Sequence, residues 1–265
     1  MNHVLAKPST GTRNGSRMRG RGTAHHNGMD PRPRIGSDAG MTAMFVTGTG
    51  NDVGKTFVVR GVIRQLRGRG VAVDALKPVI TGFDAQTVHL NDTGRLLMAL
   101  GRALTPRQIN AVSPFRLRGD FAPDHAGRVE GRPVDFKALN AFCRNAVSRR
   151  KGALLIEGCG GIMAPLDDRH TVLDWMIDVD LPAILVTGSY AGALSHVLTA
   201  LDVLERNALK IAAVVVNETT GSTDPLADTA NTVRRFTDAI EVVALPRLPD
   251  GTPEHPALAA VADLM

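Results

Sequence analysis

One segment constrains the fold of this chain more than any other, the run FVTGTGNDVGKTFVV at residues 45–59. In it, an apolar strand enters a Gly-rich turn and continues as a helix, which is the context that a phosphate-binding loop requires. The backbone N–H groups of such a loop curl around phosphates, and the positive end of the following helix points at them. The sequence therefore predicts a nucleotide-binding loop, formed by Gly50, Asn51, Asp52, Val53 and Gly54.

The helix that follows begins with two side chains suited to a nucleoside triphosphate. Lys55 can reach the outer phosphates, and the Thr56 hydroxyl can ligate magnesium. Gly48 stands one residue earlier than the GxxxxGK[ST] spacing demands, because Thr49 occupies the expected position. The position of the loop between strand and helix still predicts nucleotide binding.

Short apolar runs alternate with helical periodicity from Met44 onward, which is typical of an α/β protein with a parallel sheet. We expect strands at 44–47, 71–76, 153–157, 183–187, 211–216 and 242–245. We expect helices from Lys55 to Gly68 or Gly70 and around 91–101, 135–149, 171–178, 193–206 and 225–238. The pattern predicts an α/β fold with a single doubly wound, mostly parallel sheet of the P-loop NTPase type. Helices should cover both faces, and residues 103–134 should form a long irregular insertion.

Two acidic residues stand where further magnesium ligands are needed. Glu157 ends an apolar strand and precedes GCGG, so we expect it at the carboxyl edge of the sheet, where α/β proteins bind ligands. Asp92, in HLNDTG, can either cap the predicted helix or bind the metal, and the spacing leaves both open. Asp52 can cap the loop itself, or meet a substrate ammonium or a nucleotide hydroxyl.

Lys77 follows a strand in the segment KPVITG, so its side chain is expected at the same edge as the phosphate loop. A cation there would stabilise the charge that develops in phosphoryl transfer, and the Thr81 hydroxyl could donate beside it. A solvated strand end is the alternative for Lys77. Cys143 and Cys159 are too far apart for a CxxC motif, which predicts free thiols.

The distribution of charge argues against a nucleic-acid partner. The chain holds 31 Lys and Arg against 26 Asp and Glu, a net charge of +5, and residues 1–40 hold seven basic and two acidic residues, which is the whole excess. This Gly-, Pro- and Arg-rich segment predicts a disordered basic tail over 1–40 and a folded domain over 41–265. No stretch approaches about 18 continuous apolar residues, and the N-terminus lacks a secretory core, so we expect a cytoplasmic protein with no membrane partner.

Further motifs follow in order over most of residues 44–250. They are KPVITG at 77–82, ND at 91–92, SPFRL at 113–117, APDHA followed by EGRPV at 122–134, IEGCGGIMAPL at 156–166, LDW at 173–175, LPAILVTGSYAGALSH at 181–196, VVVNE at 214–218 and LPRLP at 245–249. With the phosphate loop, this ordered set resembles the dethiobiotin synthetases, the ATP-dependent enzymes of biotin synthesis. The early glycine at position 48 is itself what that family shows.

The resemblance implies that 7,8-diaminopelargonate takes up CO2 as a carbamate, which attacks the γ-phosphate of ATP. The mixed anhydride then closes to a ureido ring. The roles implied for particular residues are catalysis by Lys55, Lys77 and Thr81, magnesium binding by Thr56, Asp92 and Glu157, and adenine recognition by Asn217 with Pro246, Arg247 and Leu248 nearby.

The resemblance also gives a role to GSYAGALSH at 188–196, where glycines precede a predicted helix whose first N–H groups would be unpaired. An ordinary turn is the alternative. In dethiobiotin synthetases this turn binds the substrate carboxylate across a homodimer interface, which implies donors from Gly192, Ala193, Leu194 and Ser195. Three residues depart from the family: Thr81 stands where Ser is frequent, Cys159 replaces Ala, and Ser195 replaces a frequent Asn in the carboxylate site.

Other functions are compatible with the loop alone. A related amide ligase of cobalamin-type synthesis should carry a glutaminase domain, for which this chain has no room. A related P-loop ATPase of the partitioning type would carry a second Lys where Thr49 and Gly50 stand, and a GTPase would show NKxD in place of NETT at 217–220. A regulatory protein that binds ATP without turnover stays open, and turnover would decide it.

Overall fold

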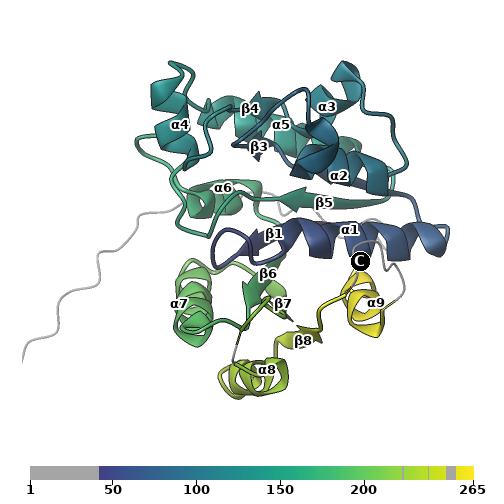
Figure 1. Ribbon diagram of the computed structural model, residues 1–265, viewed down its shortest axis with the longest axis vertical. Helices are drawn as coiled ribbons and strands as arrows, with labels where there is room; N and C mark the ends of the chain where they lie inside the picture. Colours follow the sequence, from purple (N-terminus) through teal and green to yellow (C-terminus); the bar gives the residue numbers. More distant parts are fainter. Residues whose placement is uncertain (1–41, 223, 238, 249–254) are drawn as a thin grey trace, which may run out of the picture. The chain divides into compact units, whose positions relative to one another are not determined.

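The computed structural model describes residues 42–222, 224–237, 239–248 and 255–265, and the tail expected at 1–40 lies outside them. A six-stranded sheet forms the centre of the domain (Figure 1), with the strand order β2-β5-β1-β6-β7-β8 and every pairing parallel. Its strands are β1 (Ala43–Gly48), β2 (Val73–Leu76), β5 (Ala153–Glu157), β6 (Ala183–Gly188), β7 (Ile211–Asn217) and β8 (Glu241–Leu245). All six predicted strands are therefore confirmed.

The helices pack on both faces of this sheet. Buried residues of α1 (Lys55–Gly68), α2 (Asp92–Ala99), α3 (Pro106–Val112) and α9 (Pro256–Ala262) share one apolar cluster with alternate strand residues. Those of α5 (Phe136–Arg149), α6 (Val172–Val179), α7 (Ala193–Arg206) and α8 (Leu226–Arg235) form the other. Because successive strand residues point to opposite faces, near-continuous apolar strands fill both clusters. The doubly wound prediction is confirmed, and none of the described helices is long and apolar enough to cross a membrane.

The phosphate loop follows β1, the strand at which the strand order of the sheet reverses. Strand β1 lies between β5 and β6, so the chain moves to one side of β1 first and to the other side afterwards. The crevice at the carboxyl ends of such strands is where open α/β sheets bind ligands. In the pairing of β1 with β5, Val46 lies opposite Glu157, which brings that carboxylate beside the start of the loop.

The prediction of an irregular insertion at 103–134 was wrong. The segment forms α3, the short strand β4 (Phe115–Arg116) and α4 (Pro123–Val129), and β4 pairs in parallel with β3 (Val79–Ile80). Both helices begin with Pro, a residue favoured at the first helical position because its missing N–H has no partner there anyway. Elements this short give no clear periodicity in sequence. The same holds for the short helix η1 (Val88–Leu90) and for α9.

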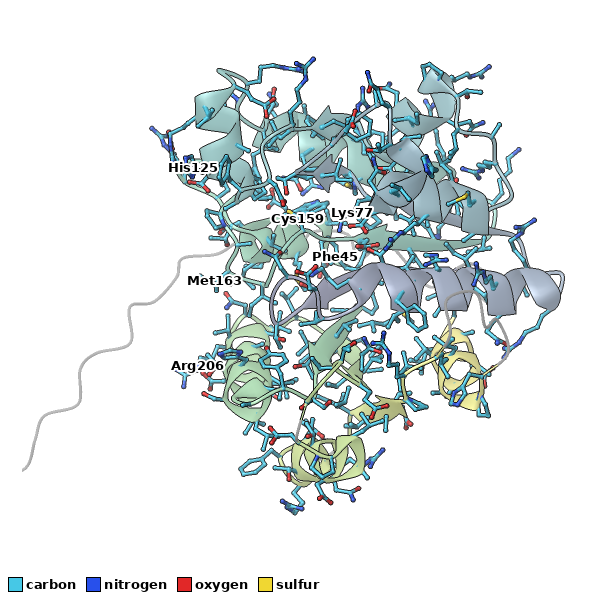
Figure 2. All side chains as sticks on the ribbon, viewed as in Figure 1. Phe45, Lys77, His125, Cys159, Met163 and Arg206 are labelled. Atoms are coloured by element: carbon cyan, nitrogen blue, oxygen red, sulfur yellow. The ribbon has the colours of Figure 1, made fainter. Side chains whose placement is uncertain are left out.

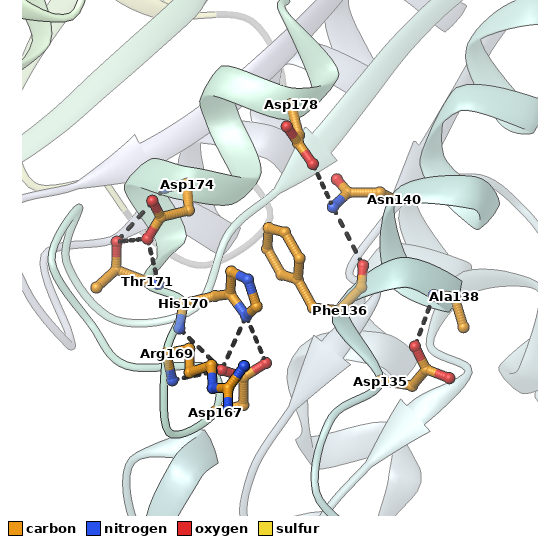
Figure 3. A network of polar contacts seen from close by, with 10 residues as sticks. All are labelled: Asp135, Phe136, Ala138, Asn140, Asp167, Arg169, His170, Thr171, Asp174 and Asp178. Atoms are coloured by element: carbon orange, nitrogen blue, oxygen red, sulfur yellow. Dashed lines mark hydrogen bonds and ion pairs between the residues drawn. The ribbon is translucent and has the colours of Figure 1, made fainter.

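A network of polar contacts holds the loop after β5 against α5 and α6 (Figure 3). Asp167 accepts hydrogen bonds from the backbone N–H groups of Arg169 and His170, each at 2.8 Å. The His170 ring stacks on Phe136 with 3.9 Å between centroids. At the start of α6, Thr171 and Asp174 form a reciprocal capping box, which satisfies donors that the helix leaves unpaired. The segment that leaves the active-site edge is thereby fixed in place.

Candidate active site

The phosphate loop runs from Thr49 to Gly54 between β1 and α1. Gly54 has a left-handed backbone (φ 96°), and a Cβ there would lie 2.2 Å from Nδ2 of Asn217, so the position requires glycine. No side chain caps α1, which leaves its first N–H groups for a ligand. Lys55 folds back over the loop, and its Nζ donates to the carbonyl oxygen of Gly50 at 2.6 Å.

Lys77 lies in a buried ion pair beside this loop. Lys77 directly follows β2, which pairs with β5, and only 4% of the residue is exposed. Its Nζ lies 2.6 Å from Oε1 of Glu157 and 2.9 Å from the carbonyl oxygen of Gly158. The Thr56 hydroxyl donates to the same Oε1 at 2.7 Å. The alternative of a solvated strand end for Lys77 was therefore wrong.

The two lysines of the site differ in their electrostatic surroundings. Burial lowers the pKa of Lys77, but the charges of Glu157 and Asp92 outweigh it and raise the pKa above its usual value. Burial, together with the positive charge of Lys77, lowers the pKa of Lys55 to about 8. Lys77 therefore stays protonated beside Glu157. Lys55 has no carboxylate as close as Glu157 is to Lys77 among the described residues, and its Nζ donates instead to the carbonyl oxygen of Gly50.

Asp92 faces this cluster and does not cap its helix. The N-cap of α2 is Asn91, whose side chain accepts a hydrogen bond from the N–H of Gly94 at 3.1 Å. Oδ2 of Asp92 lies 3.4 Å from Nζ of Lys77. Burial raises the pKa of Asp92, but the positive charge of Lys77 lowers it more, so the net shift is downward. The capping alternative for Asp92 was wrong.

Three oxygen donors at this edge suit a magnesium ion. Glu157 is fully buried, and its Oε2 has no hydrogen-bond partner among the described residues. An unpaired buried carboxylate oxygen is costly unless a cation meets it. Two carboxylates and the Thr56 hydroxyl are fewer than a complete protein shell, but Mg²⁺ usually completes its shell with phosphate oxygens and water. Glu157, Asp92 and Thr56 can therefore hold Mg²⁺ next to a bound triphosphate.

A cavity of about 640 Å³ joins these groups. Nine predicted site residues line it: Asn51, Asp52, Gly54, Lys55, Thr56, Lys77, Thr81, Asp92 and Glu157. Cys159 also lines the cavity, and Figure 2 labels it beside Lys77. Sequence reasoning gave no role to Arg95, Asp120 and Phe121, which line the cavity as well. Arg95 could have been found, because it lies three residues after Asp92 on one helix face.

The residues predicted near the adenine gather at the ends of β7 and β8. Asn217 lies opposite Leu245 in the sheet, and its Nδ2 donates to the carbonyl oxygen of Val53 at 3.1 Å. The N–H of Arg247 donates to Oε2 of Glu218 at 2.8 Å, which ties the stretch from Pro246 to Leu248 to the residue after Asn217. None of these residues is among those that line the 640 Å³ cavity.

The turn before α7 lies apart from the cavity of its own chain. Gly192 is its left-handed N-cap (φ 91°), no side chain caps the helix, and Gly192 and Ser195 are exposed. One of the four predicted donors is already used, because the N–H of Ala193 donates to the carbonyl oxygen of Tyr190 at 2.9 Å. Ala193 was predicted to donate to the substrate carboxylate, but its N–H closes the turn instead. The side chain of Leu194 is only partly buried.

The strand order, the phosphate loop and the buried lysine and carboxylate cluster define a P-loop protein of the α/β class. A family model described as "AAA domain" matches residues 42–255. The ATP-dependent dethiobiotin synthetase BioD of Caulobacter vibrioides strain NA1000 is 43% identical over 208 residues, 78% of this chain and 93% of that protein. The protein of the same name from Phenylobacterium zucineum is 41% identical over 209 residues, 78% of this chain and 89% of its own length. The chain belongs to the dethiobiotin synthetase family.

Among solved structures, the cell division ATPase MinD of Pyrococcus furiosus aligns with a TM-score of 0.47 and 17% identity, over 84% of this chain and 96% of that one.

Proposed function

We propose that the protein closes 7,8-diaminopelargonate and CO2 to dethiobiotin, with ATP converted to ADP and phosphate. The observation that carries the proposal is the buried pair of Lys77 and Glu157, joined by the Thr56 hydroxyl beside an uncapped helix end, within one cavity. Family membership favours this reaction over a partitioning ATPase, an amide ligase or a regulatory ATP-binding protein.

In the proposed reaction, an amine of the substrate adds to CO2 and loses a proton, which gives a carbamate. A carbamate oxygen attacks the γ-phosphorus, and the bond from that phosphorus to the β–γ bridging oxygen breaks, so ADP leaves. The second amine then attacks the carbamoyl carbon, the ring closes, and phosphate is released. Lys55 holds the outer phosphates, because its ammonium lies at the mouth of the loop and can exchange its bond to Gly50 for phosphate oxygens.

Lys77 and Thr81 serve the reacting end of the substrate. Both line the cavity next to Asp92 and Glu157, and a fixed cation there stabilises charge on the carbamate and on the transferring phosphoryl oxygens. Mg²⁺ held by Thr56, Asp92 and Glu157 would neutralise phosphate charge when bound. Adenine recognition is assigned to Asn217 with Pro246, Arg247 and Leu248.

The test is a measurement of phosphate release and dethiobiotin formation with ATP, Mg²⁺ and bicarbonate, with and without diaminopelargonate. Phosphate release that depends on the diamine and matches product formation supports the proposal. ATP hydrolysis of equal rate without the diamine points to a regulatory ATPase instead and overturns it.

The proposal includes a two-fold homodimer in which the turn before α7 binds the substrate carboxylate for the partner's cavity. It is supported by the exposure of Gly192 and Ser195 and by their absence from the lining of the described cavity. Gly192→Trp and Lys55→Ala should each be inactive alone, whereas their mixture should regain activity, because one hybrid site combines an intact loop with an intact turn. A fully active monomer in sedimentation, or mixtures that never regain activity, would contradict the shared site.

A further inference from the structure

A second cavity, of about 550 Å³, shares no lining residue with the catalytic one. Its walls are the turn 83–86 after β3, Pro114, and three arginines, Arg116, Arg118 and Arg132. A volume of this size is typical of sites for small molecules, and it is too small to seat a macromolecule.

The pairing of β3 with β4 brings Arg116 and Arg118 beside the turn 83–86, and Arg132 joins them from the turn after α4. The pairing continues past the strands, because the N–H of Phe83 donates to the carbonyl oxygen of Leu117 at 2.9 Å and the N–H of Gly82 to that of Gly119 at 2.9 Å. Arg116 is half-buried and held in place, because its guanidinium donates to the carbonyl oxygen of Ser113 and lies 5.4 Å from the ring centroid of Phe83.

The positive charge in this cavity is not balanced by the protein. The one acidic residue among the described lining residues is Asp84, and its carboxylate already accepts hydrogen bonds from the N–H of Gln86 at 2.9 Å and the hydroxyl of Thr87 at 3.1 Å. In the described part of the chain, the side chains of Arg118 and Arg132 form no hydrogen bond and no ion pair.

Nearby acidic side chains are directed elsewhere. Oε1 of Glu130 accepts from the backbone N–H groups of Arg118 and Gly119, at 2.6 and 2.9 Å, and does not line the cavity. Burial and the positive charge of Arg132 lower the pKa of Arg116, because the two guanidinium groups repel each other electrostatically. A single exposed arginine is well solvated and needs no partner. Three that converge on one concave surface repel one another until an anion joins them.

We propose that this cavity binds a small multivalent oxyanion of the phosphate class. The guanidinium group offers planar pairs of donors that match phosphate oxygens bidentately, and the half-buried Arg116 supplies a preorganised one. The site is separate from the phosphate loop, but it is close to the catalytic cavity along the chain, because Phe83 stands two residues after Thr81.

The probe is inorganic phosphate, titrated by calorimetry into the full-length protein in a phosphate-free buffer. Because the phosphate loop can also bind phosphate, the titration is repeated with Lys55→Ala, which disables that loop, and with Arg118→Gln/Arg132→Gln, which disables the arginine cavity. The double variant in the Lys55→Ala background removes both. We expect Lys55→Ala to retain a phosphate site and the triple variant to bind at least about tenfold more weakly.

The matched control is Arg107→Gln/Arg149→Gln in the same background, which removes two exposed arginines that line neither cavity. It should change the phosphate affinity by less than about twofold, because net charge alone acts weakly at a distance in salt. If Lys55→Ala binds no phosphate, or if the control weakens binding as much as the cavity variant does, the proposed site does not exist. The readout is binding and not turnover, so this result is independent of whether the proposed reaction is correct.

Discussion

Two helices of this protein, α1 and α7, begin in the same way and differ in what surrounds their first turns. Each follows a buried strand that ends in VTG, and the two strands, β1 and β6, are neighbours in the sheet. Each helix has a left-handed glycine as its N-cap and no side-chain cap. The backbone therefore offers an anion unpaired N–H groups at both ends, although at α7 the N–H of Ala193 already closes the turn onto Tyr190.

The difference lies in the side chains that converge on each end. Around α1, two lysines and two carboxylates meet in a cavity, and Gly54 packs against Asn217. The end of α7 is exposed, and a Cβ on Gly192 would meet nothing within 4 Å. An uncapped helix end thus offers free backbone donors in either place, whereas the proposed chemistry requires charged side chains such as Lys77 and Glu157, which converge on α1. In the proposed function, the end of α7 therefore holds an anion and takes no part in the reaction itself.

Lys77→Met should have the largest effect, because it removes the central cation of the α1 site. We expect turnover to fall by about 10²–10³. The free energy of unfolding, measured in urea, should fall by about 3–5 kcal/mol, because Glu157 is left buried without a partner. Adding Glu157→Gln should recover much of the stability and none of the turnover. Near-normal turnover in Lys77→Met would reduce this residue to a structural ion pair.

Asp92→Asn and Asn91→Ala separate metal binding from helix capping at adjacent positions. Asp92→Asn should raise the Mg²⁺ concentration needed for half-maximal turnover by about tenfold or more, since Mg²⁺ prefers anionic oxygens. Asn91→Ala should cost about 1 kcal/mol of stability and leave the Mg²⁺ titration unchanged. Equal Mg²⁺ titrations for the two variants would contradict the ligand role of Asp92.

The sequence was sufficient to predict the strands, because each is an apolar run that ends in Gly, Pro or charge. It also placed Glu157 at the active edge, since that residue ends such a run. The burial of Lys77 depends on the pairing of β2 with β5, two strands far apart in the chain, so the sequence could not decide it. The choice between Asn91 and Asp92 as cap turns on a shift of one residue, which is finer than any periodicity resolves.

The arginine cavity shows the same limit. Phe83, Arg116 and Arg132 are distant in sequence, and the pairing that joins the first two involves strands of only two residues. Strands of two residues give no pattern of alternating polar and apolar residues, so the sequence could not predict the cavity. Long-range pairings, more than local propensity, decided which charged residues meet.

Gly54→Ala and Gly192→Ala test the comparison directly, because they place the same methyl group at two equivalent backbone positions. Both impose the left-handed strain of about 1–2 kcal/mol. Gly54→Ala should in addition displace Asn217 and weaken ATP binding, measured by calorimetry, by tenfold or more, whereas Gly192→Ala should leave ATP affinity within about twofold. Equal losses of ATP affinity would mean that the two helix ends are not independent.

Ser195→Asn should have the smallest effect and should be confined to α7. Ser195 is exposed in the first turn of α7, where a longer amide side chain can add one hydrogen bond to a carboxylate held by the helix end. A net gain of about 0.5–1.5 kcal/mol corresponds to a KM for diaminopelargonate lowered by about two- to tenfold. The KM for ATP should not change, because Ser195 does not line the cavity that contains the phosphate loop of its own chain. An altered KM for ATP with an unchanged KM for the diamine would place Ser195 outside the carboxylate site and would weaken the case for a turn shared between subunits.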